Sequence, residues 1–325
     1  MSGMRPTPAG SVAEGSSTVQ RPSTPERPSR LRIWLLASRP ATLPAALSGV
    51  VVGLGAARGA GYAFRLDTAI GCVLVALLLQ VVANFANDLS DFRKGADGPD
   101  RSGPIRVAAA GLVTERQLEV AIGLVLALAG VVGLWLATIG GPVLVGLGAL
   151  AMVAALAYTG GPWPYGYKAL GEVFVFVFFG LVAVVGTAYL QALVLEPVFV
   201  AAALPVGSLV TAILVVNNLR DIPTDRAAGK RTLAVVIGPR ATQWEYAFLL
   251  AVAALLPVAL AVTGRGPALL LPLLSAPLAL PLLRTVSGFT EPRQLNPALK
   301  GTARLALVHG LLFAAGLAIS GMAGS

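Results

Sequence analysis

The sequence has very few of the residues that enzymes use for thiol, imidazole or zinc chemistry. Its 325 residues include one cysteine, Cys72, and one histidine, His309. A single cysteine excludes an intramolecular disulfide and a cysteine metal cluster. No second histidine or cysteine stands near His309 in the sequence, so a zinc site is not indicated there. With a single histidine, the sequence also gives little basis for a catalytic Ser-His or Cys-His pair. We expect both residues to serve packing.

Charged residues are also scarce, at 12% of the chain, whereas 56% of the residues are hydrophobic. Soluble domains carry about a quarter charged residues. The formal charge of +9 is spread over short loops, and no soluble basic domain exists to hold nucleic acid.

Spanning a bilayer takes about 20 apolar residues. Such stretches recur nine times, at 41–57, 68–86, 118–138, 142–158, 171–191, 197–217, 245–263, 267–284 and 303–321. We therefore predict an all-α, polytopic membrane bundle of about nine transmembrane helices.

The basic residues also predict the orientation of this bundle. If the N-terminus is cytoplasmic, all but three of the 24 Lys and Arg residues fall on the cytoplasmic side, the exceptions being Arg58, Arg65 and Arg265. Cytoplasmic loops of membrane proteins carry such an excess. We predict a multi-pass protein of the bacterial cytoplasmic membrane, with its N-terminus inside and its C-terminus outside.

The chain divides into a tail and one membrane domain. Residues 1–30 are rich in Pro, Ser, Thr and Gly and have few large apolar side chains, so we expect a disordered tail. They lack the charged start, apolar run and cleavage site of a secretory signal peptide. Residues 31–325 contain no linker and are predicted to form a single transmembrane domain.

Two groups of oxygen-bearing side chains close apolar stretches. The group after the second stretch is Asn84, Asn87, Asp88 and Asp91, and the group after the sixth is Asn218, Asp221 and Asp225. Spacings of three and four residues place side chains on one helix face. A basic, glycine-containing loop follows each group, so a pseudo-symmetric duplication would set both beside one cavity. We expect the acids to lie at helix ends near water.

These groups predict a site for a metal-bound diphosphate. Mg²⁺ usually takes one or two carboxylates and completes its shell with water and substrate phosphate oxygens. Candidate donors to the phosphate oxygens are Arg101, Arg106, Lys168, Lys230 and Arg231. The loop cations could alternatively be plain solvated charges. The acids argue against that alternative, because a carboxylate near the bilayer centre costs on the order of 3 kcal/mol and the arrangement is repeated.

Aromatic residues gather around the fifth apolar stretch: Tyr158, Trp163, Tyr165, Tyr167, Phe174, Phe176, Phe178, Phe179 and Tyr189. Aromatic faces attract cations. One or two of these rings could shield an allylic carbocation formed as diphosphate departs, and we count Tyr158 among the substrate-binding candidates. The alternative is that they face lipid or form an interfacial belt.

Together these residues resemble the UbiA-type intramembrane prenyltransferases, and more narrowly the 1,4-dihydroxy-2-naphthoate polyprenyltransferases of menaquinone biosynthesis. The resemblance covers 32–322 and is carried by five stretches, 38–45, 84–97, 101–106, 158–172 and 217–235. It implies a helical bundle whose central cavity opens laterally to lipid and is capped by two cytoplasmic loops. It also implies Mg²⁺ as cofactor, with a polyprenyl diphosphate and an aromatic acceptor as substrates.

Position by position, the resemblance implies roles for individual residues. The metal and diphosphate ligands, through which catalysis would act, would be Asn84, Asp88, Asp91, Asp221 and Asp225, and the basic positions facing substrate anions would be Arg39, Lys168 and Lys230. Two positions depart from the family pattern. Gly95 stands where a third aspartate is common, and Pro223 interrupts the second motif, so we expect Asp225 to reach the site from a kink or a loop.

The reaction implied by the resemblance is an electrophilic aromatic substitution. The prenyl group moves from its diphosphate to dihydroxynaphthoate, the ring carboxylate leaves as carbon dioxide, and demethylmenaquinone is formed. Two alternatives stay open: another acceptor (4-hydroxybenzoate, homogentisate or a chlorin), or a transporter or channel lined by acids. For an enzyme, we expect Asp88→Ala and Asp221→Ala to lose turnover without unfolding.

Overall fold

The computed structural model describes residues 3, 28–95, 103 and 106–322. Most of the predicted tail, residues 1–30, lies outside the described residues. The end of that segment, from Pro28, leads into the first helix, whose N-cap is Ser29. Arg101, a predicted phosphate donor, also lies outside the described residues.

Throughout the described part the chain is helical, with no β-strand. The helices are α1 (Arg30–Ser38), α2 (Leu43–Gly59), α3 (Leu66–Arg93), α4 (Glu115–Gly140), α5 (Val143–Ala157), α6 (Gly171–Val175), α7 (Ala183–Ala192), α8 (Pro197–Ala227), α9 (Leu233–Leu260), α10 (Ala276–Gly288) and α11 (Leu295–Met322). Short 3-10 or π segments join some of them: η1 (Pro40–Thr42), η2 (Tyr165–Tyr167), η3 (Phe176–Val182), η4 (Ala261–Arg265), η5 (Pro267–Ser275) and η6 (Pro292–Gln294). The prediction of an all-α membrane protein is confirmed.

Eight helical stretches in these ranges are long and apolar enough to cross a membrane, and α5 is a shorter apolar helix. These nine correspond in order to the nine predicted spans. Several spans are composite. The first joins α1, η1 and α2, and the fifth joins α6, the π segment η3 and α7.

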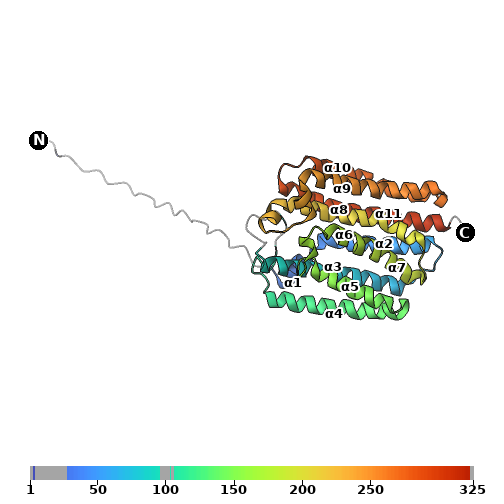
Figure 1. Cartoon of the computed structure of the whole chain (residues 1–325), viewed down its shortest axis with the longest axis horizontal. Helices are drawn as coiled ribbons and strands as arrows, with labels where there is room; N and C mark the ends of the chain where they lie inside the picture. Colours follow the sequence, from blue (N-terminus) through green and yellow to red (C-terminus); the bar gives the residue numbers. More distant parts are fainter. Residues whose placement is uncertain (1–2, 4–27, 96–102, 104–105, 323–325) are drawn as a thin grey trace.

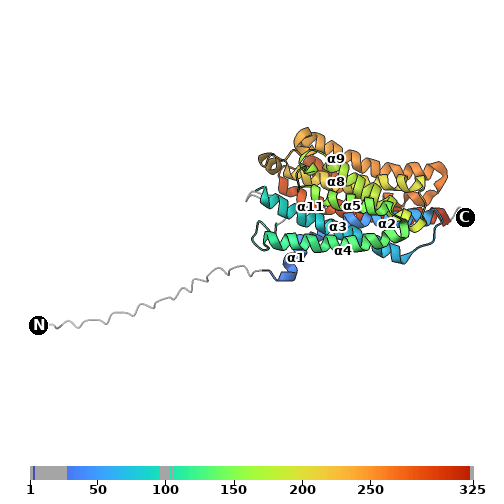
Figure 2. The same ribbon diagram turned by 60° about the horizontal axis from the view of Figure 1, so that its bottom comes forward.

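The helices lie side by side as one bundle (Figure 1). Both views place α1 at one end of the bundle and the C-terminal end of α11 at the other (Figures 1 and 2). In both views α4 lies at one outer face and α8 lies between α4 and α9, and in Figure 1 α10 lies beyond α9. The apolar window of α8 is 78% buried, against 17% for α4. The second motif is therefore carried by the central helix.

Two helices extend further than the apolar runs suggested. The second apolar run was expected to end near residue 86, but α3 continues as a helix to Arg93. The expectation that Asp225 could lie on a loop after Pro223 is wrong, because α8 continues through that proline to Ala227. Proline removes a single N–H donor, and the hydrogen bond from the Lys230 N–H to the Asp225 carbonyl, at 2.8 Å, helps to close the helix end. Both motifs thus stand on helices.

Helices α2 and α11 approach each other so closely that only glycine fits at some positions. A Cβ atom at Gly55 would lie 2.4 Å from Ala314 Cα, and one at Gly59 would lie 2.3 Å from the Leu317 carbonyl oxygen. Small residues let membrane helices pack backbone against backbone, where dispersion replaces the hydrophobic effect as the attraction. We call this contact the α2–α11 seam.

Gly55→Val is expected to destabilise the protein, because overfilling a close-packed contact costs about 1–3 kcal/mol. The measurement is the thermal midpoint of the detergent-purified protein. The matched control is Gly133→Val on α4, where a new Cβ meets nothing within 4 Å. Equal midpoints for the two variants would contradict the close approach.

Candidate active site

Asp88, in the first motif, is buried and accepts hydrogen bonds from two backbone amides. Its side chain is only 1% exposed. Its carboxylate accepts hydrogen bonds from the N–H groups of Val107, at 3.0 Å, and Ala108, at 3.3 Å. Asp88 therefore fixes the segment that precedes α4 against the end of α3. The expectation that the motif acids lie near water is wrong, because Asp91, Asp221 and Asp225 are buried as well.

Asp91 is held by two side chains from different parts of the fold. Arg106 donates to Oδ2 at 2.8 Å, and the Tyr167 hydroxyl donates to Oδ1 at 3.0 Å. Both members of the Arg106 pair are buried. A carboxylate oxygen has more than one lone pair, so these bonds orient Asp91 and still leave it able to bind a cation.

The two asparagines of the first motif have different surroundings. Asn84 donates its amide hydrogens to the Ser38 carbonyl, at 2.9 Å, and to Thr42 Oγ1, at 3.0 Å. It ties α3 to the junction of α1 and η1, where Arg39 adopts a left-handed conformation with φ 49°. Asn87 Oδ1 is buried and has no hydrogen-bond partner among the described atoms. Of the two amides, Asn87 offers the freer oxygen.

Arg220 organises the second motif from a buried position. Its guanidinium donates two bonds to Asp221, both 2.7 Å, one to Asn217 at 2.9 Å and one to Asn296 at 3.1 Å. Arg220 is 2% exposed. The charge of Asp221 is thus balanced by the residue next to it, and α8 is tied to the start of α11 through Asn296.

Asp225 is less constrained than the other three acids. Its Oδ1 lies 3.6 Å from Lys230 Nζ. Its Oδ2 is buried and has no hydrogen-bond partner among the described atoms. About two turns earlier on α8, Asn218 donates to Glu172 Oε1 at 2.8 Å. Asn218 Oδ1 and Glu172 Oε2 also lack partners within the described part, so this side of the site holds unused acceptors.

The two motifs face each other across Tyr167. Asp225 interacts electrostatically with Asp91 and with Asp221. Lys94, just after α3, and Lys230, just after α8, both place their ammonium groups near the Tyr167 ring, 4.1 and 5.2 Å from its centroid. Burial lowers the pKa of Lys94, the charge of Asp91 opposes that shift, and the charge of Lys230 adds to it. Acids and cations from both halves of the chain therefore share one site.

The remaining predicted cations lie at its edge. Lys168 and Arg231 are exposed and are joined by a backbone bridge. The Lys168 ammonium lies 5.3 Å from the centroid of the Trp163 ring. Neither side chain is placed among the motif acids by the contacts of the described residues, in contrast to Arg106 and Lys230.

An aromatic run leads from the site into the bundle. Tyr158 lies edge-on to Tyr165 with centroids 5.4 Å apart, Tyr165 stacks on Phe174 at 4.0 Å, and Phe174 stacks on Phe178 at 6.2 Å. Burial raises the pKa of Tyr158 well above its usual value, and the charge of Glu172 adds to the shift. Tyr189 is not part of this run, since its hydroxyl donates to the Gly140 carbonyl at 2.8 Å, at the far end of α4.

Sequence reasoning missed four residues of this arrangement: Lys94, Tyr167, Glu172 and Arg220. Tyr167 was expected only as one of several aromatic shields. Arg220 and Glu172 do have a signal in the sequence, because a charged residue inside a long apolar run must find a buried partner. The sequence gives no such signal for Lys94 and Tyr167, since their contact depends on how two distant loops meet.

The oxygen ligands offered by the two motifs fit a metal ion that is also bound by the phosphate oxygens of a substrate. Among the described residues, no group of three or more His, Cys, Asp or Glu side chains is assembled to hold a metal ion. Each motif instead presents a buried oxygen that lacks a partner in the described part, Asn87 Oδ1 on one side and Asp225 Oδ2 on the other. Such a split, oxygen-only set suits Mg²⁺ bound jointly by protein and diphosphate.

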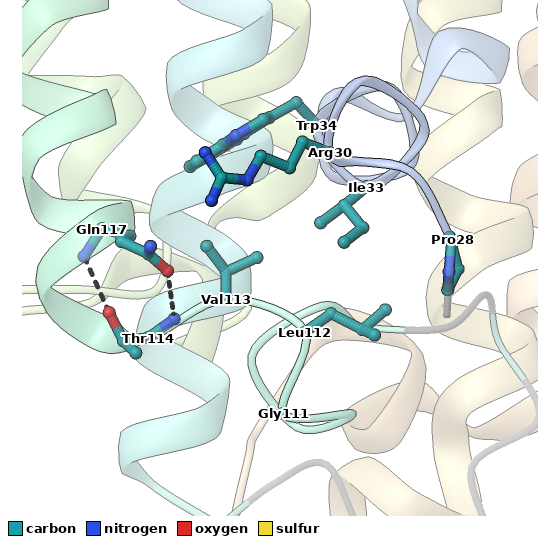
Figure 3. Close-up of a pocket in the computed structure, with 9 residues that line it drawn as sticks. All are labelled: Pro28, Arg30, Ile33, Trp34, Gly111, Leu112, Val113, Thr114 and Gln117. Carbon is teal, nitrogen blue, oxygen red and sulfur yellow. Dashed lines mark hydrogen bonds between the residues drawn. The ribbon is translucent and has the colours of Figure 1, made fainter. Parts of the chain in front are cut away.

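A separate pocket of about 500 Å³ opens at the same end of the bundle. Figure 3 shows its described lining, which comes from α1 and the segment that leads into α4. Trp34 and Arg30 cover one side, and Thr114 and Gln117 form a reciprocal helix cap on the other. None of the described lining residues belongs to the two motifs.

Comparison with known proteins identifies the family. The pattern of the UbiA prenyltransferase family matches residues 46–308. The chain belongs to this family. The UbiA-family protein described here is 43% identical, over 88% of its length, to the 1,4-dihydroxy-2-naphthoate octaprenyltransferase of Mycobacterium tuberculosis, 96% of which is covered. It is 39% identical over 91% of its length to the enzyme of the same name from Escherichia coli, 98% of which is covered.

Solved structures confirm the fold. A UbiA homolog from Aeropyrum pernix, in its apo form, superposes with a TM-score of 0.61 at 18% identity, covering 90% of this UbiA-family protein and 99% of the homolog. A UbiA homolog from Archaeoglobus fulgidus bound to GPP and Mg²⁺ gives a TM-score of 0.61 at 17% identity, with 86% and 99% covered. At these identities the likeness concerns the fold alone.

Proposed function

We propose that this UbiA-family protein transfers a polyprenyl group from its diphosphate to 1,4-dihydroxy-2-naphthoate, forming the quinol (reduced) form of demethylmenaquinone, diphosphate and carbon dioxide. The observation that carries prenyl transfer is that Asp91 and Asp225 interact electrostatically, while Tyr167 bonds to Asp91 and has Lys94 and Lys230 beside its ring, at one end of an apolar bundle. The naphthoate acceptor is supported by the two relatives that bear that name at 43% and 39% identity.

The proposed cofactor is Mg²⁺, as in the Archaeoglobus fulgidus homolog. The residues proposed to hold it are Asn84, Asp88, Asp91, Asp221 and Asp225, joined by Asn87 through its unpartnered oxygen. Bound there, Mg²⁺ supplies positive charge that stabilises the departing diphosphate. Since Asp88, Asp91 and Asp221 are already oriented by hydrogen bonds, they resemble metal ligands held by outer partners.

The residues of the chain provide the rest of the chemistry. Arg106, Lys94 and Lys230 supply cations for the phosphate oxygens. Arg106 and Lys230 are buried, where charge interactions are strong, and Lys94 is exposed. The bond between the allylic carbon and the diphosphate oxygen breaks, and its electron pair leaves with the diphosphate. The ring forms the new carbon–carbon bond, and its carboxylate leaves as carbon dioxide. Tyr158 is proposed to face the electron-poor allylic group with its ring.

The protein is a multi-pass membrane protein by its apolar helices, and we propose that the site end of the bundle faces the cytoplasm. Arg58 and Arg65, which the sequence predicts to lie outside the cytoplasm, flank the turn between α2 and α3. That turn lies at the opposite end of α3 from the first motif. The positive-inside tendency then puts the site inside.

Purified protein in detergent should make one main product when offered several acceptors and several prenyl diphosphates together. With dihydroxynaphthoate, 4-hydroxybenzoate and homogentisate present, mass spectrometry is expected to find prenylated, decarboxylated naphthoquinol. Product formed only from another acceptor would contradict the naphthoate assignment. Ion flux in liposomes without any prenyl product would contradict the enzyme assignment altogether.

A further inference from the structure

Tyr167 ends a rigid turn that touches both halves of the site. The turn η2 is anchored on one side by the Gly166 N–H, which donates to the Tyr158 carbonyl at 2.8 Å. A Cβ atom at Gly166 would lie 2.6 Å from that oxygen, so the approach requires glycine. On the other side the bridge between Lys168 and Arg231 joins the turn to the chain that follows α8. The position of Tyr167 is therefore set by the backbone.

Three charged groups meet at the Tyr167 side chain. The hydroxyl donates to Asp91 Oδ1 at 3.0 Å. The ring has the ammonium of Lys94 4.1 Å from its centroid and that of Lys230 5.2 Å from it. Lys94 follows the first motif and Lys230 follows the second, so one ring gathers a cation from each motif.

The two ammonium groups repel each other, and burying Lys230 costs solvation, whereas Lys94 is exposed. The ring offers its electron-rich face to both. Carboxylates balance the charge on either side, Asp91 near Lys94 and Asp225 at 3.6 Å from Lys230. Lys94 also donates to the Thr159 carbonyl. The result is a pair of partly desolvated cations, held near each other and near two motif acids.

We propose that Tyr167 is a positioning residue, whose ring sets Lys94 and Lys230 as a cation pair for the diphosphate and whose hydroxyl orients Asp91. The proposal rests on the proposed function, because it takes the anion to be the diphosphate end of the prenyl substrate. It assigns Lys94 to diphosphate binding, and it gives the ring and the hydroxyl of Tyr167 separate roles. A purely structural tyrosine would tie the loops together without favouring either substrate.

The test compares Tyr167→Leu, which removes ring and hydroxyl, with Tyr167→Phe, which removes only the hydroxyl. Tyr167→Leu is expected to raise the KM for the prenyl diphosphate at least tenfold and to leave the KM for the aromatic acceptor within twofold. Tyr167→Phe keeps the ring, so its KM for the prenyl diphosphate should stay within threefold of wild type. Its half-maximal Mg²⁺ concentration should rise severalfold, because Asp91 loses a partner.

The matched control is Tyr189→Leu, which makes the same chemical change at the far end of α4 and should alter neither KM. A second readout does not need turnover: thermal stabilisation by inorganic diphosphate with Mg²⁺ should be weakened in Tyr167→Leu and retained in Tyr167→Phe. If Tyr167→Leu does not fold, Lys94→Met decides, with an expected tenfold rise in the KM for the prenyl diphosphate.

The proposal is overturned if Tyr167→Leu or Lys94→Met leaves that KM within twofold, or if Tyr167→Leu raises the KM values of both substrates equally. Tyr167→Phe matching Tyr167→Leu in every readout would also overturn it, because the ring would then have no separate role. Failure of the proposed function is distinct. There, wild-type protein itself would form no prenylated product, whatever residue stands at position 167.

Discussion

Asp225→Asn is expected to lower turnover by more than about 100-fold, equivalent to about 2.7 kcal/mol of barrier, while the protein stays folded. Asp225 is the motif acid whose neighbours depend on it least. Oδ2 has no partner in the described part, and Oδ1 makes only a 3.6 Å contact with Lys230. Asparagine keeps the volume and removes the charge that would hold the metal as negative charge builds up on the diphosphate. Turnover is measured at saturating Mg²⁺.

The matched control is Asp67→Asn on α3, an exposed carboxylate 3.7 Å from Arg65 at the other end of that helix. It should leave turnover unchanged. If Asp225→Asn were folded and kept more than about a tenth of wild-type turnover, an effect below about 1.4 kcal/mol, the two-motif mechanism would have to be abandoned.

The alanine variants expected from sequence to act cleanly, Asp88→Ala and Asp221→Ala, carry a structural cost as well. Alanine at 88 leaves two backbone N–H groups, of Val107 and Ala108, without their acceptor, at about 1–3 kcal/mol for each buried group. Alanine at 221 leaves the buried Arg220 without its charge partner, and breaking such a pair costs about 3–5 kcal/mol. Their loss of turnover would mix catalysis with folding.

Removal of divalent metal is expected to abolish prenyl transfer, with Mg²⁺ restoring it. The oxygen-only donors of the two motifs suit hard cations, and a metal ion between the motif acids and the diphosphate offsets the repulsion between their negative charges. The measurement is product formation in excess chelator, before and after Mg²⁺ is returned. A second measurement is thermal stabilisation by prenyl diphosphate, which amounts to about 2.7 kcal/mol at a ligand concentration of 100 Kd and should require Mg²⁺.

The control is thermal stability without any diphosphate, which chelation should leave unchanged because the described acids are balanced by protein donors such as Arg106 and Arg220. Full prenyl transfer in excess chelator would refute the metal-diphosphate assignment. Unfolding of the substrate-free protein by chelator would show instead that a metal has a structural role.

The spans were predictable because apolar length is decisive in a bilayer. The ends of the spans were harder to predict. The second apolar run was expected to end near residue 86, yet α3 continues to Arg93, because backbone groups there are satisfied within the helix while Asp88 and Asp91 find partners in other segments. Pro223 read as a break, yet α8 continues through it to Ala227 and loses one backbone N–H donor there.

The site was predictable only as a set of residue types. The spacing of Asp88 and Asp91 indicates a shared helix face, and their repeat at Asp221 and Asp225 suggests a second one. Nothing in the spacing says that Asp221 pairs with its neighbour Arg220, or that Asp225 keeps an unpartnered oxygen. Those differences follow from long-range contacts, such as Arg220 with Asn296, and they decide which substitution gives a clean test.

The α2–α11 seam has a consequence for how the protein is made. The ribosome delivers α2 to the membrane early and α11 only after all the other helices described here. Until then the glycine face of α2, at Gly55 and Gly59, has only lipid against it, and no large side chain covers its backbone. A nascent chain can therefore insert its spans one by one, but the bundle closes around its first transmembrane helix only when α11 has arrived.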